Sequence, residues 1–414
     1  MNAIELAALF VTIAAGFGYL NFRFLKFPPT IGLLVISLLG SLLLILVDMG
    51  LPGYDLTGLV RAAVVKIDFY QAVMEGMLGF LLFAGALHVN LSDLRGQRWP
   101  IALMATFGVV LSTFVVGVGF WWLAGVPILV ALVFGSLISP TDPVAVMGIL
   151  KTVTVPKSLE TKIAGESLFN DGIGVVVFLV LVALAFPAAG APELTWVDVV
   201  KLLLVEAVGG ALLGLTTGWV AFRMLRQIDD YTLEVIITLA LVMGGYALAG
   251  AIHVSGPISV VVAGLLIGNR GVRLAMSEKT VGHVRTFWHL VDEILNAVLF
   301  LLIGVEVFAI STAAQDLTIA VIVIPLVLLA RTLAVAVPMG VLRLRREFTP
   351  GAIPVMIWGG LRGGISVALV LSLPDNPDKP LLLTVTYIVV IFSIVVQGLT
   401  VKKLIQLFVP SGKT

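Results

Sequence analysis

Residues 165–174 read GESLFNDGIG, and they run directly into an apolar stretch that ends at Phe186. The carboxylate of Asp171 therefore falls on a segment that is apolar enough to lie in a membrane. A charged side chain at the centre of a membrane helix costs roughly 2.5–3.5 kcal/mol on insertion scales, so it is retained mainly where it has a function or a partner. On a helix, Ser167, Asp171 and Gly174 share one face, because they lie four and three residues apart.

The composition of the whole chain agrees with a membrane setting. The 414 residues are 60% hydrophobic and only 12% charged, whereas about a quarter of a soluble domain is charged. We predict an all-α polytopic membrane protein that forms a single membrane domain over residues 1–414. The net charge of +1 gives no indication of a nucleic-acid partner, and the absence of cysteine excludes disulfides and thiolate metal sites. The start of the chain lacks the basic region of a signal peptide, so its first apolar run is expected to remain as a span.

About 20 apolar residues cross a bilayer, and runs of this kind predict thirteen spans. Pro52 and Gly53, with mixed charge around them, predict a loop over residues 48–68. The expected spans are approximately 3–24, 29–47, 69–90, 99–124, 127–149, 160–186, 196–222, 231–251, 256–269, 285–310, 317–342, 351–373 and 381–408.

The positions of the basic residues test this count. Alternate loops, beginning with residues 25–28 and ending with the C-terminus, hold 19 of the 25 Lys and Arg residues, and the opposite loops hold 4. The other two, Arg331 and Arg362, fall inside spans. Because basic residues concentrate in cytoplasmic loops, we expect the N-terminus outside and the C-terminus in the cytoplasm.

Two of the expected spans carry helix-breaking sequences. The fifth contains SPTDP at 139–143, and the twelfth contains GGLRGG at 359–364. Proline removes a backbone donor, and glycine permits an unwound backbone. Paired interruptions in corresponding spans are a sequence indication of a transporter site. Since the fifth span starts outside and the twelfth starts inside, we predict inverted repeats with two crossed, discontinuous helices.

The acid and hydroxyl side chains near these interruptions are candidates for an ion site. Asp171 would bind a proton or a cation, but not both together; the alternative is a structural acid paired with a buried Arg. Asp142 lies between two prolines, where it could cap the second half-helix or bind a cation with the freed carbonyls near Thr141. Ser167 and Asn170 could add side-chain oxygens to the same site.

The two arginines inside spans need partners, because a guanidinium does not lose its charge in a protein. For Arg362 the preferred partner is Glu166, which does not share the face of Asp171, and Asp142 is the competing choice. The sequence gives no clear partner for Arg331.

The tenth span carries polar residues at helical spacing near its cytoplasmic start, namely His289, Asp292, Glu293 and Asn296. They are either a solvated helix end or an acidic funnel, with Asp292 and Glu293 attracting cations. Glu306, at the outer end of the same span, is expected to be interfacial.

Four segments together resemble the NhaP-type sodium/proton antiporters of bacteria and archaea. They are SLISPTDPVAV at 136–146, GESLFNDGIGVVVF at 165–178, NAVLFLLIG at 296–304 and GGLRGGISVAL at 359–369. This group is the monovalent cation:proton antiporter-1 family, which is related to animal sodium/proton exchangers. The resemblance covers the whole chain, and its four motifs occur in the order typical of the family.

The resemblance implies a transporter rather than an enzyme, without a cofactor, that exchanges Na⁺, or alternatively Li⁺ or K⁺, for H⁺ in a cell membrane and serves pH homeostasis. It implies a homodimer of thirteen-helix protomers. An ion-translocation core, residues 99–186 and 317–408, would move like an elevator against a dimerisation part, residues 1–90 and 196–310.

The resemblance also implies roles for individual residues. The side chain of Arg362 would pair with that of Glu166, in agreement with the choice made from the residues alone. The Asn170-Asp171 pair is typical of electroneutral members of the family. The monovalent cation, exchanged for a proton at Asp171, would be bound by Asp171, Asp142, Thr141 and Ser167.

One position departs from the family pattern. Many relatives carry an acid in the third span where this chain has Ala84, and Glu75 is nine residues away from it. The full ligand set and the cation preference therefore stay open.

Two other functions use the same acids. A channel would use them as a selectivity ring, but the inverted broken helices favour a transporter. An intramembrane aspartyl protease would use Asp142 and Asp171 as its dyad; the prolines beside Asp142 and the missing Gly-Asp motif on a second span argue against it.

Overall fold

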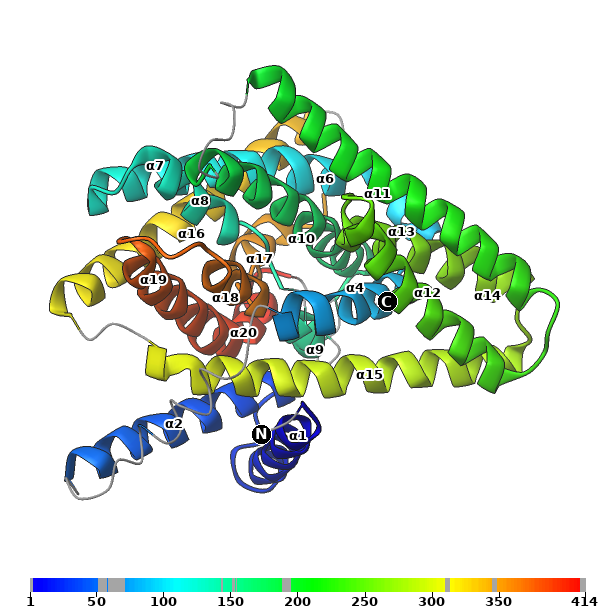
Figure 1. The fold of residues 1–414 in the computed structure, drawn as a ribbon, viewed down its shortest axis with the longest axis horizontal. Coiled ribbons are helices and arrows are strands. Elements are labelled where there is room, and N and C mark those ends of the chain that lie inside the picture. Colours follow the sequence, from blue (N-terminus) through cyan, green and yellow to red (C-terminus); the bar gives the residue numbers. More distant parts are fainter. Residues whose placement is uncertain are drawn as a thin grey trace.

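The computed structural model describes residues 3–50, 58, 71–142, 144–150, 153, 155–187, 195–309, 313–344 and 348–409. These residues form helices joined by short turns, with no strand among them. Most of the loop predicted at 48–68 lies outside the described residues. Figure 1 shows a bundle in which α15 (Glu278–Val305) runs along one side, with α1 (Ala3–Leu20) and α2 (Pro29–Gly50) beyond it.

Eleven helices of the described chain are long and apolar enough to cross a membrane. Several contain a short π-helical turn, such as η3 (Met104–Gly108) and η6 (Ser393–Gln397). The remaining α-helices of these spans are α4 (Leu78–His88), α6 (Arg98–Leu103), α7 (Val109–Ala124), α10 (Lys157–Ala185), α11 (Trp196–Leu225), α12 (Tyr231–Ala251), α13 (Gly256–Leu266), α14 (Val272–Leu274), α16 (Ala314–Arg343), α19 (Lys379–Phe392) and α20 (Gly398–Phe408).

Two further spans are broken, as the sequence predicts. Residues 138–143 separate α8 (Ile128–Leu137) from α9 (Val144–Leu150), and residues 359–363 separate α17 (Ala352–Trp358) from α18 (Gly364–Leu371). With the eleven long helices, these two give the thirteen spans expected. The two unwound segments touch, because the backbone N–H of Asp142 donates to the carbonyl oxygen of Leu361 at 2.8 Å. The crossing of two discontinuous helices is thus confirmed.

The crossing depends on a glycine at its point of closest approach. A Cβ atom added to Gly363 would lie 2.4 Å from Oδ2 of Asp142, closer than any real contact. The side chain of Asp142 therefore occupies the space that a larger residue would fill. The unwound backbone is buried within the protein, which is where irregular backbone is tolerated at membrane depth.

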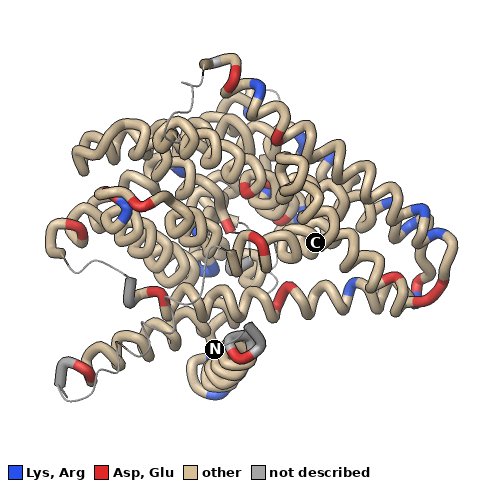
Figure 2. The backbone as a smooth tube through the Cα atoms, viewed as in Figure 1, with Lys and Arg blue, Asp and Glu red and all other residues tan. Residues whose placement is uncertain are grey.

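The outer surface of the bundle is largely apolar. On α11, large apolar side chains such as Val197, Leu212 and Trp219 are exposed, as expected of a helix that faces lipid. Most of the tube in Figure 2 is uncharged, and a few charged residues lie at the centre of the bundle. The buried charged residues there lie on and beside α10, and they mark the candidate site.

Candidate functional site

A cavity of about 360 Å³ leads into the bundle between α4, α10, α15 and α18. Asp171, Asp142 and Gly363 contribute to its wall, and it therefore reaches the crossing of the broken helices. Ala84, at the position where the sequence departs from the family pattern, also lines it. The cavity thus joins the predicted ion site to one end of the bundle.

Asp171 lies in the middle of α10 and is 5% exposed. Its carboxylate makes no hydrogen bond with the residues that the structure describes, and Asp142 lines the same cavity. Two ionised carboxylates in one confined space repel each other, and a bound proton or cation relieves that repulsion. The geometry is therefore suited to holding one positive charge.

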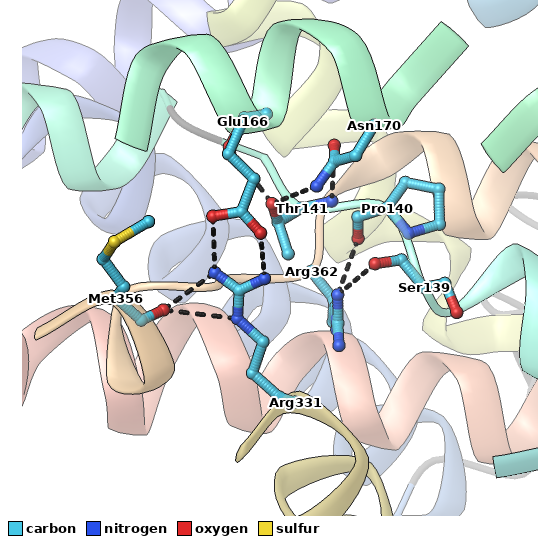
Figure 3. Close-up of polar contacts among 9 residues, drawn as sticks. Ser139, Pro140, Thr141, Glu166, Asn170, Arg331, Met356 and Arg362 are labelled. Carbon is cyan, nitrogen blue, oxygen red and sulfur yellow. Dashed lines mark hydrogen bonds and ion pairs between the residues drawn. The ribbon is translucent and has the colours of Figure 1, made fainter. Parts of the chain in front are cut away.

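Three other predicted site residues meet behind the cavity wall. The hydroxyl groups of Thr141 and Ser167 lie 3.1 Å apart. Nδ2 of Asn170 donates to Oγ1 of Thr141 at 2.8 Å, as Figure 3 shows. These three side chains are buried and do not themselves line the cavity. The structure therefore brings all five predicted residues to the crossing, with the two carboxylates in front and the hydroxyl and amide groups behind.

Arg362 binds backbone carbonyls at the crossing. Its Nη1 atom donates to the carbonyl oxygens of Ser139 and Pro140, the latter at 3.0 Å (Figure 3). These carbonyls follow the C-terminal end of α8, where a helix carries partial negative charge. The guanidinium of Arg362 therefore stabilises the broken end of α8.

The predicted ion pair between Glu166 and Arg362 is wrong, because Glu166 pairs with Arg331. Nη1 and Nη2 of Arg331 bind the two carboxylate oxygens of Glu166, with Nη2 at 3.0 Å from Oε2. Arg331 also donates to the carbonyl of Met356 through Nη2 at 2.8 Å and Nε at 3.2 Å. The sequence analysis gave no partner for Arg331. It also did not predict that Arg362 would donate its hydrogen bonds to the backbone carbonyls of a broken helix.

A glycine makes room for Arg331. A Cβ atom on Gly360 would lie 2.2 Å from Nε of Arg331. The second broken span thus supplies both a carbonyl acceptor, from Met356, and the space for the guanidinium. The sequence alone provided no signal for this pairing, because Gly360 and Arg331 lie on different spans.

The four polar residues predicted at the start of the tenth span all line the cavity. Nδ2 of Asn296 donates to Oδ1 of Asp292 at 3.0 Å, and Nε2 of His289 lies 4.0 Å from Oε1 of Glu293. The ring of His88, which the sequence analysis did not single out, lies edge-on to that of His289 with 6.5 Å between centroids. Asp292 and Glu293 therefore occupy the wall expected of a funnel.

Within the described ranges, no three His, Cys, Asp or Glu side chains gather in a way that could hold a metal ion. A cation bound here would rely on one or two carboxylates together with hydroxyl, amide or backbone oxygens.

Comparisons with known proteins show which family and which fold this chain resembles. The family model described as "Sodium/hydrogen exchanger, transmembrane" matches residues 8–407. The Na⁺/H⁺ antiporter NhaP of Pseudomonas aeruginosa is 45% identical over 416 residues, covering 97% of this chain and 96% of that protein. The Na⁺/H⁺ antiporter NhaH of Halobacillus dabanensis is 35% identical over 389 residues, covering 93% of each. Among solved structures, the sodium proton antiporter MjNhaP1 of Methanocaldococcus jannaschii at pH 8 has the same fold, with a TM-score of 0.76, 19% identity and 97% of each chain covered.

Proposed function

The chain belongs to the transmembrane sodium/hydrogen exchanger family and is a sodium/proton antiporter, and on this premise we propose that Asp171 alternately binds a proton and a monovalent cation. The observation that carries the proposal is the position of Asp171, buried on α10 at the wall of a cavity that it shares with Asp142. A carboxylate there can hold either ion, and occupation by one excludes the other.

The charges at the crossing support an exchange of one cation for one proton. Glu166 is neutralised by Arg331. The ionised carboxylate of Asp171 carries one negative charge, which one proton or one monovalent cation neutralises. An empty, ionised site would be costly to move across the membrane, whereas either loaded form is neutral. The exchange is therefore electroneutral.

Movement of a rigid unit would expose the site to each side in turn. The Glu166–Arg331 pair joins α10 to α16, and the bonds of Arg362 to Ser139 and Pro140 join the two broken spans. All of these elements belong to the core proposed at residues 99–186 and 317–408. The cavity separates this core, on the side of α10 and α18, from α4 and α15 of the remaining part. Such a boundary suits an elevator-like displacement of the core.

The cavity mouth is assigned to the cytoplasmic side. It includes Lys157 and lies beside the basic loops that the distribution of Lys and Arg places in the cytoplasm. In this orientation the N-terminus is outside, the C-terminus is cytoplasmic and the structure is inward-facing. Asp292 and Glu293 then give the entrance a negative potential that raises the local cation concentration.

Proteoliposomes that contain the protein, a pH dye and an imposed proton gradient test this function. Addition of sodium should dissipate the gradient at a rate independent of the membrane potential, and the apparent KM for sodium should rise as the pH falls. Lithium and potassium, measured in the same way, define the cation preference. A current without proton movement would indicate a channel, and a sodium affinity independent of pH would contradict competition at one carboxylate.

A homodimer in a cell membrane and a role in pH homeostasis complete the proposal. Support for them comes from the similarity over nearly the full length of bacterial antiporters. Cross-linking in native membranes tests the dimer, and growth of an antiporter-deficient strain at high sodium and alkaline pH tests the physiological role.

A further inference from the structure

A contact between α15 and α18 closes the wall of the cavity beside the crossing. Leu299 of α15 packs against Gly364, the first residue of α18, so closely that a Cβ atom on Gly364 would lie 2.4 Å from Cδ1 of Leu299. Beyond this contact, α15 continues to its end at Val305. The closure therefore involves one helix from each of the two parts proposed to move against each other.

The end of α15 is held by two hydroxyl groups. The last carbonyls of a helix lack partners within the helix. The carbonyl of Gly304 accepts a hydrogen bond from Oγ of Ser41 on α2 at 3.1 Å, and the carbonyl of Ile303 accepts one from the hydroxyl of Tyr387 on α19. Tyr387 is completely buried. One bond thus stays within the dimerisation part, and the other connects that part to the core.

We propose that the hydrogen bond from Tyr387 to Ile303 is a latch that closes the outer entrance and favours the inward-facing state. The proposal rests on the proposed function, because it assigns α19 to the moving core and α15 to the stationary part. Exposure of Asp171 to the outside would require the core to leave this position. The bond from Ser41 would persist through that step, and the bond from Tyr387 would break.

The latch favours the inward-facing state over the outward-facing state, because the hydrogen bond is buried only in the inward-facing state. In the inward-facing state the hydroxyl of Tyr387 and the carbonyl of Ile303 satisfy each other in a dry environment, where a broken bond is costly. In the outward-facing state, water can reach both groups. Removing the hydroxyl therefore destabilises the inward-facing state selectively.

A buried acid lies beside the latch. Glu306 follows the end of α15 and is 8% exposed, so its side chain lies within the protein rather than on its surface. It lies within electrostatic reach of Tyr387. Opening of the latch would expose this carboxylate to the outer solution, where it would attract the next cation.

The test uses single cysteines, because the chain has none of its own. A reporter at the outer end is Leu383→Cys, which is buried one helical turn before Tyr387 on the same face of α19. A reporter at the cavity is Leu81→Cys on α4. Each is labelled in membranes with an impermeant thiol reagent, applied to the outer side for Leu383→Cys and to the cytoplasmic side for Leu81→Cys.

With Tyr387→Phe, the labelling rate of Leu383→Cys should rise by about two- to tenfold, the range that follows from loss of one hydrogen bond. The labelling rate of Leu81→Cys should not rise. An unchanged outer rate, or an increase at both reporters, would overturn the latch, since the second result indicates general loosening.

Tyr246→Phe is the matched control. The hydroxyl of Tyr246 donates to the carbonyl of Met74 at 2.6 Å, and both residues lie outside the proposed core. The same chemical change there should leave the labelling of Leu383→Cys unchanged. The labelling rate does not depend on ion exchange. The labelling experiment therefore tests the latch, and the exchange measurement in proteoliposomes tests the role of Asp171 separately.

Discussion

Glu166 of α10 and Arg331 of α16 form a buried, two-point ion pair, although 165 residues separate them in the chain. Arg331 also binds the carbonyl of Met356 at the end of α17. The pair therefore ties the helix that carries Asp171 to the helix that precedes the second unwound segment. Arg362, which could have competed for Glu166, binds the carbonyls of Ser139 and Pro140 instead.

Replacing Arg331 by Met should strongly destabilise the protein. The change leaves Glu166 charged and unpaired in a buried environment, which costs about 3–5 kcal/mol. Thermal unfolding in detergent should show a large fall in Tm. The double variant Arg331→Met with Glu166→Gln should recover part of the loss, because it no longer buries an uncompensated charge.

The control for this change is Lys157→Met. Lys157 pairs with Glu160 at 3.0 Å, but its side chain is 67% exposed. An exposed pair contributes about 0–1 kcal/mol, so the Tm should hardly change. Equal effects of Arg331→Met and Lys157→Met would contradict a structural role for the buried pair.

Replacing Arg362 should show whether its charge or its shape matters. The two bonds that its side chain makes to the carbonyls of Ser139 and Pro140 come from a single nitrogen, Nη1, and the ammonium group of a lysine could make the same two contacts. Arg362→Lys should therefore retain exchange, at a rate at least about tenfold above that of Arg362→Met. If both variants were equally inactive in proteoliposomes, charge compensation of the end of α8 would not explain the role of Arg362.

Gly174→Ala should impair exchange by displacing the crossing. A Cβ atom at Gly174 would lie 2.4 Å from Cγ of Pro140, so α10 and the first unwound segment would have to separate. Gly340→Ala is the control, because Gly340 is exposed on α16 and has no atom within 4 Å of an added Cβ. That change should be neutral or stabilising by up to about 1 kcal/mol. Full exchange activity of Gly174→Ala would argue against a tightly packed crossing.

Thr141→Val should weaken cation binding while leaving the fold intact. The hydroxyl of Thr141 contacts both Ser167 and Asn170 directly behind the two carboxylates. Losing it should raise the apparent KM for sodium by roughly three- to tenfold, the effect of one polar contact. The control is Thr106→Val, because among the described residues the hydroxyl of Thr106 bonds only within its own helix, to the carbonyl of Ala102 at 2.7 Å. An unchanged KM in Thr141→Val would remove this hydroxyl from the cation site.

The sequence predicts the architecture closely because membrane helices obey simple rules of length and polarity. The apolar runs locate all thirteen spans, and the prolines and glycines locate the two broken ones. Helical spacing places Ser167, Asn170 and Asp171 on adjoining faces of α10, whereas the resemblance to the family, and not the spacing, brings Thr141 and Asp142 to the same site. These features depend on local chemistry, which a single sequence contains.

The pairing of buried charges could not be predicted in the same way. The guanidinium of Arg362 can be satisfied either by a carboxylate or by the backbone carbonyls that a broken helix exposes. Helical spacing predicts which side chains lie close together, but it does not predict which backbone carbonyls are free to accept. Glu306 is buried because α15 ends against α2 and α19, and the sequence of its own span does not reveal that packing. Long-range geometry decides both cases.

The most direct test of the central claim compares the wild type with Asp171→Asn in proteoliposomes holding an imposed proton gradient. Asp375→Asn is the matched control, because the carboxylate of Asp375 is fully exposed on a turn before α19. On addition of sodium, wild type and Asp375→Asn should dissipate the gradient, while Asp171→Asn should be inactive with an unchanged Tm. Exchange by Asp171→Asn at the rate of the wild type would contradict the assignment of proton and cation binding to this carboxylate.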